Sequence, residues 1–145
     1  MSSFNSFIMV RKNKSLLIAL SILWTINLFG QKEPFSNCAA IFLNEKLVVD
    51  DYSPTGKCQL PYSSTGKLTV CSATYENDKW SCTEKIDFRV AIKDGNTKTL
   101  WSFSDQSFKE IDFKQVLAKC KKGDFVVILT VNNLHALPHN EILVE

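Results

Sequence analysis

The sequence holds five cysteines, Cys38, Cys58, Cys71, Cys82 and Cys120, and sulfur chemistry is the first chemistry that it suggests. In an oxidising compartment, this density favours one or two disulfides with one thiol left over. The alternative is that several of the five are reduced and packed as small hydrophobic residues. No C-x-x-C spacing is present, so a redox site or zinc knuckle of that type has no support.

Cys71 and Cys82 form the best candidate pair, and Cys38 and Cys58 are further disulfide candidates. The spacer between Cys71 and Cys82 contains the turn-forming run 76–79. A hairpin in the right register would place the two cysteines on facing strands. A slip of one residue would place them on opposite faces of the sheet.

Cys120 is the candidate for a free thiol. It lies among Lys119, Lys121 and Lys122, whose ammonium groups would favour a thiolate. Two features oppose a reactive cysteine here: the residue continues the apolar stripe of a predicted helix, and the C-terminal end of a helix dipole disfavours an anion. The pattern therefore favours a core cysteine or a disulfide partner.

His135 and His139 are the only histidines, and Glu141 follows them closely. On a helix their spacing would place both imidazoles on one face, as in a metal site. Pro138 prevents a regular helix there, and no cysteine or acid at a ligand spacing completes the set. We therefore expect two loop histidines, with no metal and no cofactor. Nothing resembles a nucleophile elbow, a phosphate-binding glycine loop or an HExxH helix.

Several aromatic residues could bind a ligand, with Trp80, Trp101 and Tyr75 as the main candidates beside Tyr52 and Tyr62. Exposed rings can form a platform for a carbohydrate or a peptide. In a small β domain, however, aromatic residues more often fill the core.

The N-terminal region has the pattern of an export signal. A basic cluster at 11–14 precedes an apolar run from Leu16 to Phe29. This pattern predicts a signal peptide over residues 1–30, cleaved between Gly30 and Gln31. Translation starting at Met9 would give a leader of ordinary length and leave residues 1–8 untranslated.

Two kinds of membrane attachment remain as alternatives to cleavage. A retained anchor is disfavoured because the apolar run is shorter than the roughly 20 residues that span a bilayer. Lipidation of Cys38 is disfavoured because residues 31–34 separate it from the apolar run and Asn37 precedes it. The domain would meet a membrane only if the leader were retained.

Charge excludes one class of partner. Without residues 1–30, Lys+Arg falls from 17 to 14 while Asp+Glu stays at 15, so the remaining chain has a net charge of −1. A strongly basic nucleic-acid binder is therefore excluded. The 145 residues, 45% of them hydrophobic and 22% charged, are enough for one folded domain, which we place at 31–145.

Most apolar runs in residues 31–145 predict strands. Ile86 to Ile92 alternates apolar and polar residues, and a turn at 94–96 leads into a returning strand over Thr97 to Phe103. In the run from Phe125 to Val131, both alternating sets of positions carry apolar residues, which predicts a central strand covered on both faces. Ile142 to Val144 predicts a last strand.

One short helix is predicted at about 112–122. Asp112 is a good N-cap, and the apolar stripe includes Phe113, Val116 and Cys120. Gly123 can adopt the left-handed conformation that ends a helix. Together the patterns predict a mainly β fold: a small β-sandwich-like domain of about seven or eight strands with this one helix.

The stretch from Phe88-Arg89-Val90 through the capped helix to Leu137-Pro138 somewhat resembles the C-terminal β-domain of GldM-type proteins. These are periplasmic components of the gliding motility and type IX secretion machinery of Bacteroidetes. The resemblance covers residues 86–145 and implies a β-sandwich-like interaction module in the periplasm. It does not extend to the family's several stacked domains or to its role in a motor.

These features indicate an exported protein, periplasmic or extracellular, that is a non-enzymatic protein-interaction module. No catalytic set is assembled in the sequence, and the expected partner is another envelope protein rather than a nucleic acid. One alternative is a small thiol-dependent or redox-responsive envelope protein that uses an unpaired cysteine. Another is a glycan-binding module that uses the aromatic residues.

Overall fold

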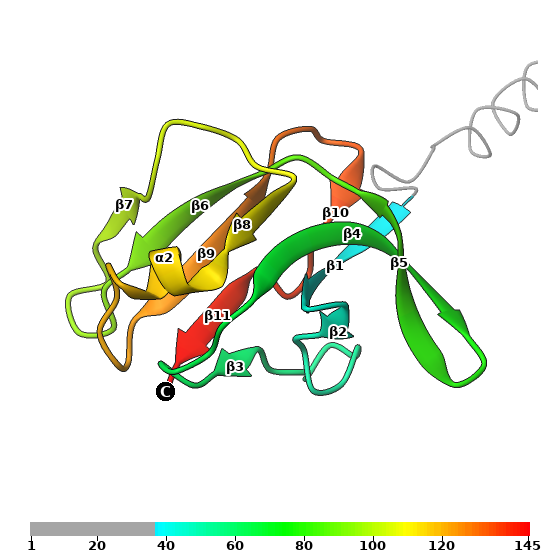
Figure 1. Ribbon diagram of the computed structural model, residues 1–145, viewed down its shortest axis with the longest axis horizontal. Coiled ribbons are helices and arrows are strands. Elements are labelled where there is room, and N and C mark those ends of the chain that lie inside the picture. Colours follow the sequence, from blue (N-terminus) through cyan, green and yellow to red (C-terminus); the bar gives the residue numbers. More distant parts are fainter. Residues whose placement is uncertain (1–36) are drawn as a thin grey trace, which may run out of the picture. The chain divides into compact units, whose positions relative to one another are not determined.

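The computed structural model describes residues 37–145, which form two β-sheets and one short helix (Figure 1). The predicted leader over residues 1–30, the start at Met9 and the cleavage between Gly30 and Gln31 lie outside the described residues. The strands are β1 (Asn37–Leu43), β2 (Lys46–Leu47), β3 (Gln59–Leu60), β4 (Lys67–Glu76), β5 (Lys79–Lys85), β6 (Phe88–Lys93), β7 (Leu100–Ser102), β8 (Glu110–Asp112), β9 (Phe125–Thr130), β10 (His135–Ala136) and β11 (Glu141–Val144).

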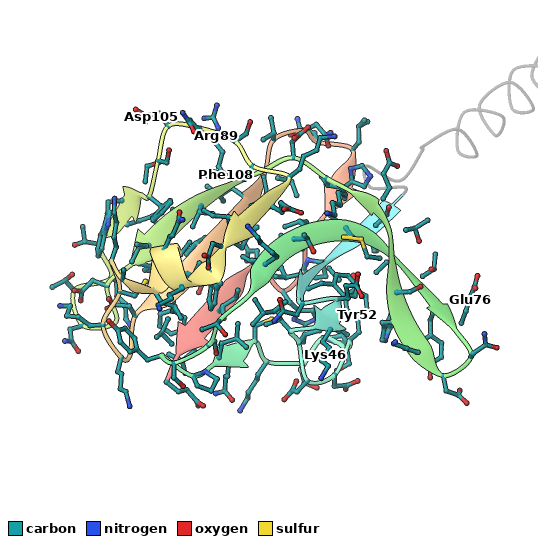
Figure 2. All side chains as sticks on the ribbon, viewed as in Figure 1. Lys46, Tyr52, Glu76, Arg89, Asp105 and Phe108 are labelled. Atoms are coloured by element: carbon teal, nitrogen blue, oxygen red, sulfur yellow. A yellow bond between two sulfur atoms is a disulfide. The ribbon has the colours of Figure 1, made fainter. Side chains whose placement is uncertain are left out.

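The first sheet has the order β10-β1-β4-β5, with β2 also paired to β1 and β8 also paired to β4. β4 and β5 form a hairpin whose far end projects beyond the other strands (Figure 1). Glu76 marks the end of this hairpin in Figure 2. The first sheet therefore presents one long, projecting element to the solvent.

The second sheet has the order β3-β11-β9-β6-β7. Its last strand in sequence, β11, is internal: it pairs antiparallel with β9 and parallel with β3. Glu145 continues this interaction, because its N–H donates to Leu60 O and its carbonyl accepts from Tyr62 N.

The core lies between the inner faces of the two sheets. Its fully buried side chains are Phe42, Phe88, Phe113, Leu68, Ile92, Ile128, Ile142, Val70, Val90, Val116, Val126 and Val144. All of these except Phe42 belong to the main cluster, and Phe42 packs in a smaller cluster with Ala40 and Cys71. Burial of apolar surface on this scale is the main source of folding free energy.

The prediction of a mainly β, sandwich-like fold with one short helix is confirmed. The side chains of residues 86, 88, 90 and 92, in β6 and just before it, are buried while Arg89 is exposed, as the alternation predicts. Ala91, on the face predicted to be exposed, is however buried as well. β7 returns beside β6 as predicted, with Ile92 opposite Trp101, but it spans only Leu100–Ser102 and not the predicted 97–103. The eleven strands in residues 37–145 exceed the predicted seven or eight. Among the additional strands, the very short β8 and β10 carry no sequence pattern of their own.

The prediction that the strand after Phe125 is covered on both faces is only partly correct. β9 is central, between β6 and β11, and Val126, Val127 and Ile128 are buried. Leu129, however, is 44% exposed. Apolar residues on both faces of a strand predict a layer that covers the outer face. Single exposed leucines are nevertheless common on protein surfaces.

The helix is shorter than predicted. α2 spans Phe113–Leu117, and Asp112 caps it by accepting a hydrogen bond from Lys114 N. Beyond Leu117 the bonding tightens, since Lys119 N donates to Val116 O and Cys120 N to Leu117 O, both three residues back. This 3₁₀-like bonding ends the helix one turn early. The predicted apolar stripe is nevertheless buried, including Cys120.

A buried carboxylate joins two loops at one end of the second sheet. Asp124 accepts hydrogen bonds from Gly95 N at 3.1 Å and from Lys121 N at 2.8 Å. Gly95 packs so closely on this loop that an added Cβ would lie 2.0 Å from Gly123 O. These hydrogen bonds and this close packing hold the turn between β6 and β7 against the loop after α2.

Candidate functional site: the projecting hairpin and its groove

The β4–β5 hairpin is closed by a two-residue turn. Asn77 and Asp78 have φ values of 51° and 59°, the left-handed conformation that both central residues of a type I′ turn require. The predicted turn at 76–79 is therefore confirmed. The turn sets a register in which Tyr75 faces Trp80 and Ala73 faces Cys82.

Three aromatic rings form a row on the face of this hairpin that carries Tyr75. The Tyr75 and Trp80 ring centroids are 5.1 Å apart, and those of Trp80 and Tyr52 are 4.6 Å apart. His139 continues the row with its ring against Tyr52. We call Tyr52, Trp80 and Tyr75 the aromatic row.

The aromatic row is fixed at one end and exposed at the other. Tyr52 is part-buried, its hydroxyl donates to Ala39 O at 2.9 Å, and burial raises the pKa of that hydroxyl, with a smaller contribution from nearby Cys38. Tyr75, at the projecting end, is 56% exposed. Because Tyr52 holds one end of the row in place, little side-chain entropy is lost when a partner contacts the exposed ring of Tyr75. The row is therefore a favourable contact surface.

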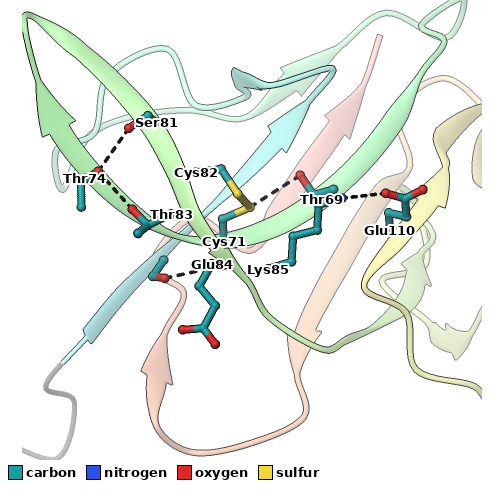
Figure 3. Close-up of a disulfide and its surroundings, with 10 residues drawn as sticks. Thr69, Cys71, Thr74, Ser81, Cys82, Thr83, Glu84, Lys85 and Glu110 are labelled. Atoms are coloured by element: carbon teal, nitrogen blue, oxygen red, sulfur yellow. Dashed lines mark hydrogen bonds and ion pairs between the residues drawn. A yellow bond between two sulfur atoms is a disulfide. The ribbon is translucent and has the colours of Figure 1, made fainter.

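The opposite face of the hairpin is polar. The hydroxyl of Thr74 lies 3.1 Å from those of both Ser81 and Thr83 (Figure 3). The two faces therefore differ sharply, one built from hydroxyl groups and the other from aromatic rings and sulfur.

Cys71 and Cys82 form a disulfide, as predicted for this pair (Figure 3). The two residues are not directly opposite: Cys71 faces Lys85, and Cys82 faces Ala73. A bulge between Ser72 and Ala73 shifts the register along the strand pair. Cys71 is fully buried and Cys82 is half-buried, so only Cys82 has a solvent-facing side.

A groove of about 810 Å³ runs beside the disulfide. Among its lining residues are Lys67, Thr69, Trp80, Cys82 and Lys85. The ammonium group of Lys85 lies 2.8 Å from a Glu110 carboxylate oxygen, and this contact holds the pKa of Glu110 below its usual value. The groove thus combines one ring of the aromatic row, that of Trp80, with lysine and glutamate side chains and the disulfide residue Cys82.

The outer edge of β5 is a poor template for another strand. β5 pairs only with β4 among the strands of residues 37–145. The bulge interrupts its register, and Lys79 and Lys85 stand at its two ends. Bulges and lysines are the features that natural edge strands use to prevent pairing with a further strand.

Cys58 and Cys120 lie apart from this site, whereas Cys38 lies near Tyr52, at the fixed end of the aromatic row. Cys38, Cys58 and Cys120 form no disulfide, so residues 37–145 hold one disulfide and not two. Cys38 is exposed on β1. Cys120 is buried, and its thiol lies 3.4 Å from Val116 O. The structure gives no sign of the lysine-activated thiolate considered for Cys120.

We expect only Cys38 to react when the folded protein meets iodoacetamide at neutral pH. Burial raises the pKa of the Cys58 thiol to about 11, with a smaller contribution from Asp50, and burial likewise raises that of Cys120 to about 11. Both thiols therefore stay protonated and unreactive until the pH approaches that value. Peptide mapping after brief alkylation measures this, and rapid labelling of Cys120 at pH 7 would contradict it.

The remaining candidates are dispersed. Trp101 lies on β7 in the second sheet, away from the aromatic row, so it does not join Trp80 and Tyr75 as a single platform. His139 lies in a loop as expected, but His135 lies in the short strand β10, which pairs with β1. The Nδ1 atom of His135 is 3.3 Å from Asn132 Oδ1. In residues 37–145, no group of three or more histidine, cysteine or acidic side chains could hold a metal ion.

Comparisons with known proteins add no relative. No known protein family matches the sequence, and no curated protein and no solved structure is significantly similar to it. Within the described residues, no helix is both long enough and apolar enough to cross a membrane. The description of the fold and of the site therefore rests on the structure of this chain alone.

Two parts of this site were not among the main candidates from sequence. Tyr52 is distant from Trp80 along the chain, and their contact arises only because the loop after β2 folds back over the first sheet. The lysines of the groove likewise come from separate strands, Lys67 from β4 and Lys85 from β5. No local sequence signal predicts either contact.

Proposed function

We propose that this protein is an exported interaction module whose aromatic row binds another envelope protein. The observation that carries the proposal is the aromatic row itself: Tyr75 is well exposed on a projecting hairpin, while Trp80 and Tyr52 anchor it from behind. Tyrosine and tryptophan are enriched among the residues that dominate binding energy at protein interfaces.

The geometry favours side-chain contacts over strand addition. A partner that added a strand to β5 would meet the bulge and the terminal lysines described above. A partner that packs on Tyr75 meets no such obstacle, and the groove beside Trp80 offers room for its side chains.

The compartment is part of the same proposal. The disulfide between Cys71 and Cys82 is compatible with an oxidising environment, and the sequence of the leader predicts export to the periplasm or the cell exterior. The resemblance of residues 86–145 to the closing β-domain of GldM-type proteins supports the same kind of module. The raised pKa of the Cys120 thiol opposes the alternative of a thiol-dependent activity at that residue.

A photo-crosslinking residue at position 75 tests this function. Full-length protein carrying benzoylphenylalanine in place of Tyr75 is produced in its own cells, irradiated and purified. We expect one defined protein adduct. The matched control places the same residue at Tyr62, a tyrosine that is 42% exposed outside the aromatic row, and should give none.

The variant Tyr75→Ala should weaken binding to the captured partner about tenfold, because an exposed tyrosine at the centre of an interface commonly contributes this much. Tyr62→Ala should leave the affinity unchanged. Isothermal titration with each purified variant measures both. Equal adducts at positions 75 and 62 would refute the proposal. A change in tryptophan fluorescence on adding envelope polysaccharide, without any protein adduct, would instead establish the glycan-binding alternative.

A further inference from the structure

The geometry points to a thiol–disulfide exchange site in the groove, at which an incoming thiolate attacks Cys82 and opens the Cys71–Cys82 disulfide. The co-reactant is a dithiol reductant. The consequence for the aromatic row rests on the proposed function, whereas the exchange itself does not.

Access to the two sulfurs is unequal. Cys82 is half-buried and lines the groove of about 810 Å³, so a thiol can reach it from solvent. Cys71 is fully buried, within a small cluster that includes Ala40 and Phe42. Exchange depends on which sulfur can be approached, so the attack falls on Cys82.

Cys71 is the leaving group because Cys82 is the sulfur that is attacked, although the apolar burial of Cys71 opposes the thiolate that forms. Thr69 Oγ1 lies 3.8 Å from Cys71 Sγ (Figure 3), and its hydroxyl can donate to the thiolate that forms there. Lys67 and Lys85 line the same groove, where Lys85 is paired with Glu110. Cationic groups in the groove attract the incoming thiolate rather than the buried Cys71 sulfur.

The reaction proceeds in two balanced steps. The first thiolate of the dithiol forms a bond to Cys82 Sγ while the Cys71–Cys82 bond breaks, and Cys71 leaves as a thiolate. That thiolate takes a proton from water once opening of the hairpin exposes it. The second thiol of the reductant then attacks its own mixed-disulfide sulfur and releases Cys82 as a thiol. The protein gains two electrons and two protons, and the dithiol becomes a cyclic disulfide.

Opening the disulfide should loosen the surface that carries the aromatic row. The bond is the only covalent link between β4 and β5 besides their turn, and it lies at the bulge, where the strand register is already interrupted. Cys82 and Trp80 both pack against the small cluster around Cys71. Reduction would therefore release β5 and the ring of Trp80 together.

Two measurements on the full chain, carrying Cys38→Ser to remove the one exposed competing thiol, test this inference. In the first, brief treatment with glutathione is stopped with acid, and free thiols are blocked with N-ethylmaleimide after unfolding. We expect peptides with glutathione on Cys82 and maleimide on Cys71, in about tenfold excess over the reverse arrangement.

The second measurement follows amide exchange after dithiothreitol treatment. Residues 79–82 should exchange about tenfold faster than in the oxidised protein, while β6 and β9 stay unchanged. The double variant Cys71→Ala/Cys82→Ala is the control and should match the reduced protein with or without reductant. Glutathione mainly on Cys71, resistance to both thiols, or an unchanged exchange rate in β5 would overturn the inference. None of these readouts needs a partner, so they stand apart from the crosslinking test.

Discussion

Replacing Asp124 with alanine should lower the free energy of unfolding by about 3 kcal/mol, one of the largest effects of any single polar substitution in this domain. Asp124 is only 3% exposed, and its carboxylate accepts from both Gly95 N and Lys121 N. Alanine would leave these two N–H groups without an acceptor in a region that water reaches poorly. Chemical denaturation measures the loss.

Two variants show whether the hydrogen bonds are responsible. Asp124→Asn keeps one acceptor oxygen and should cost about half as much as Asp124→Ala. Asp105→Ala removes an exposed acid and should change stability by less than about 0.5 kcal/mol. If Asp124→Ala behaved like Asp105→Ala, the two loops would not be held by this carboxylate.

Phe113→Ala should destabilise the domain by about 4 kcal/mol, which follows from the cavity left by a buried phenylalanine. Phe113 is fully buried at the start of α2, and its N–H donates to Gly66 O. The ring therefore connects the helix to the core between the sheets. Thermal and denaturant unfolding both report the change.

The neighbouring exposed residue provides the control, since Lys114→Ala alters the same helix without touching the core. Its effect should remain within about 0.5 kcal/mol. A loss for Phe113→Ala below about 1 kcal/mol would mean that the helix contributes little to the core.

Local patterns predicted those parts of the fold that depend on neighbouring residues. The turn at Asn77 and Asp78 and the candidate pair Cys71 and Cys82 both lie in one short hairpin, so the sequence indicated them. The bulge that sets the final register beside the disulfide carries no sequence signal. The alternation in β6 depends only on which face of a strand is buried. Patterns with period two report this directly.

Features that depend on the packing of distant segments were not predictable in the same way. The predicted helix is longer than α2 because the loop after the helix is held by Asp124, whose carboxylate also accepts from Gly95 N on the distant turn between β6 and β7. Tyr52 joins the aromatic row through a loop, and Trp101 is excluded from it by lying on the other sheet. An aromatic residue carries no sequence signal of which sheet it will join.

The internal position of β11 sets the order in which the domain can be completed. Chains emerge from a ribosome or a translocation pore with the N-terminal end first, so among the strands of residues 37–145 β11 appears last. Until it does, β3 and β9 lack the strand that lies between them. The β4–β5 hairpin needs only nearby residues, so its disulfide can form while the second sheet is still open. A chain that lacks residues 141–145 should therefore still form the disulfide-linked β4–β5 hairpin, but it should not complete the second sheet.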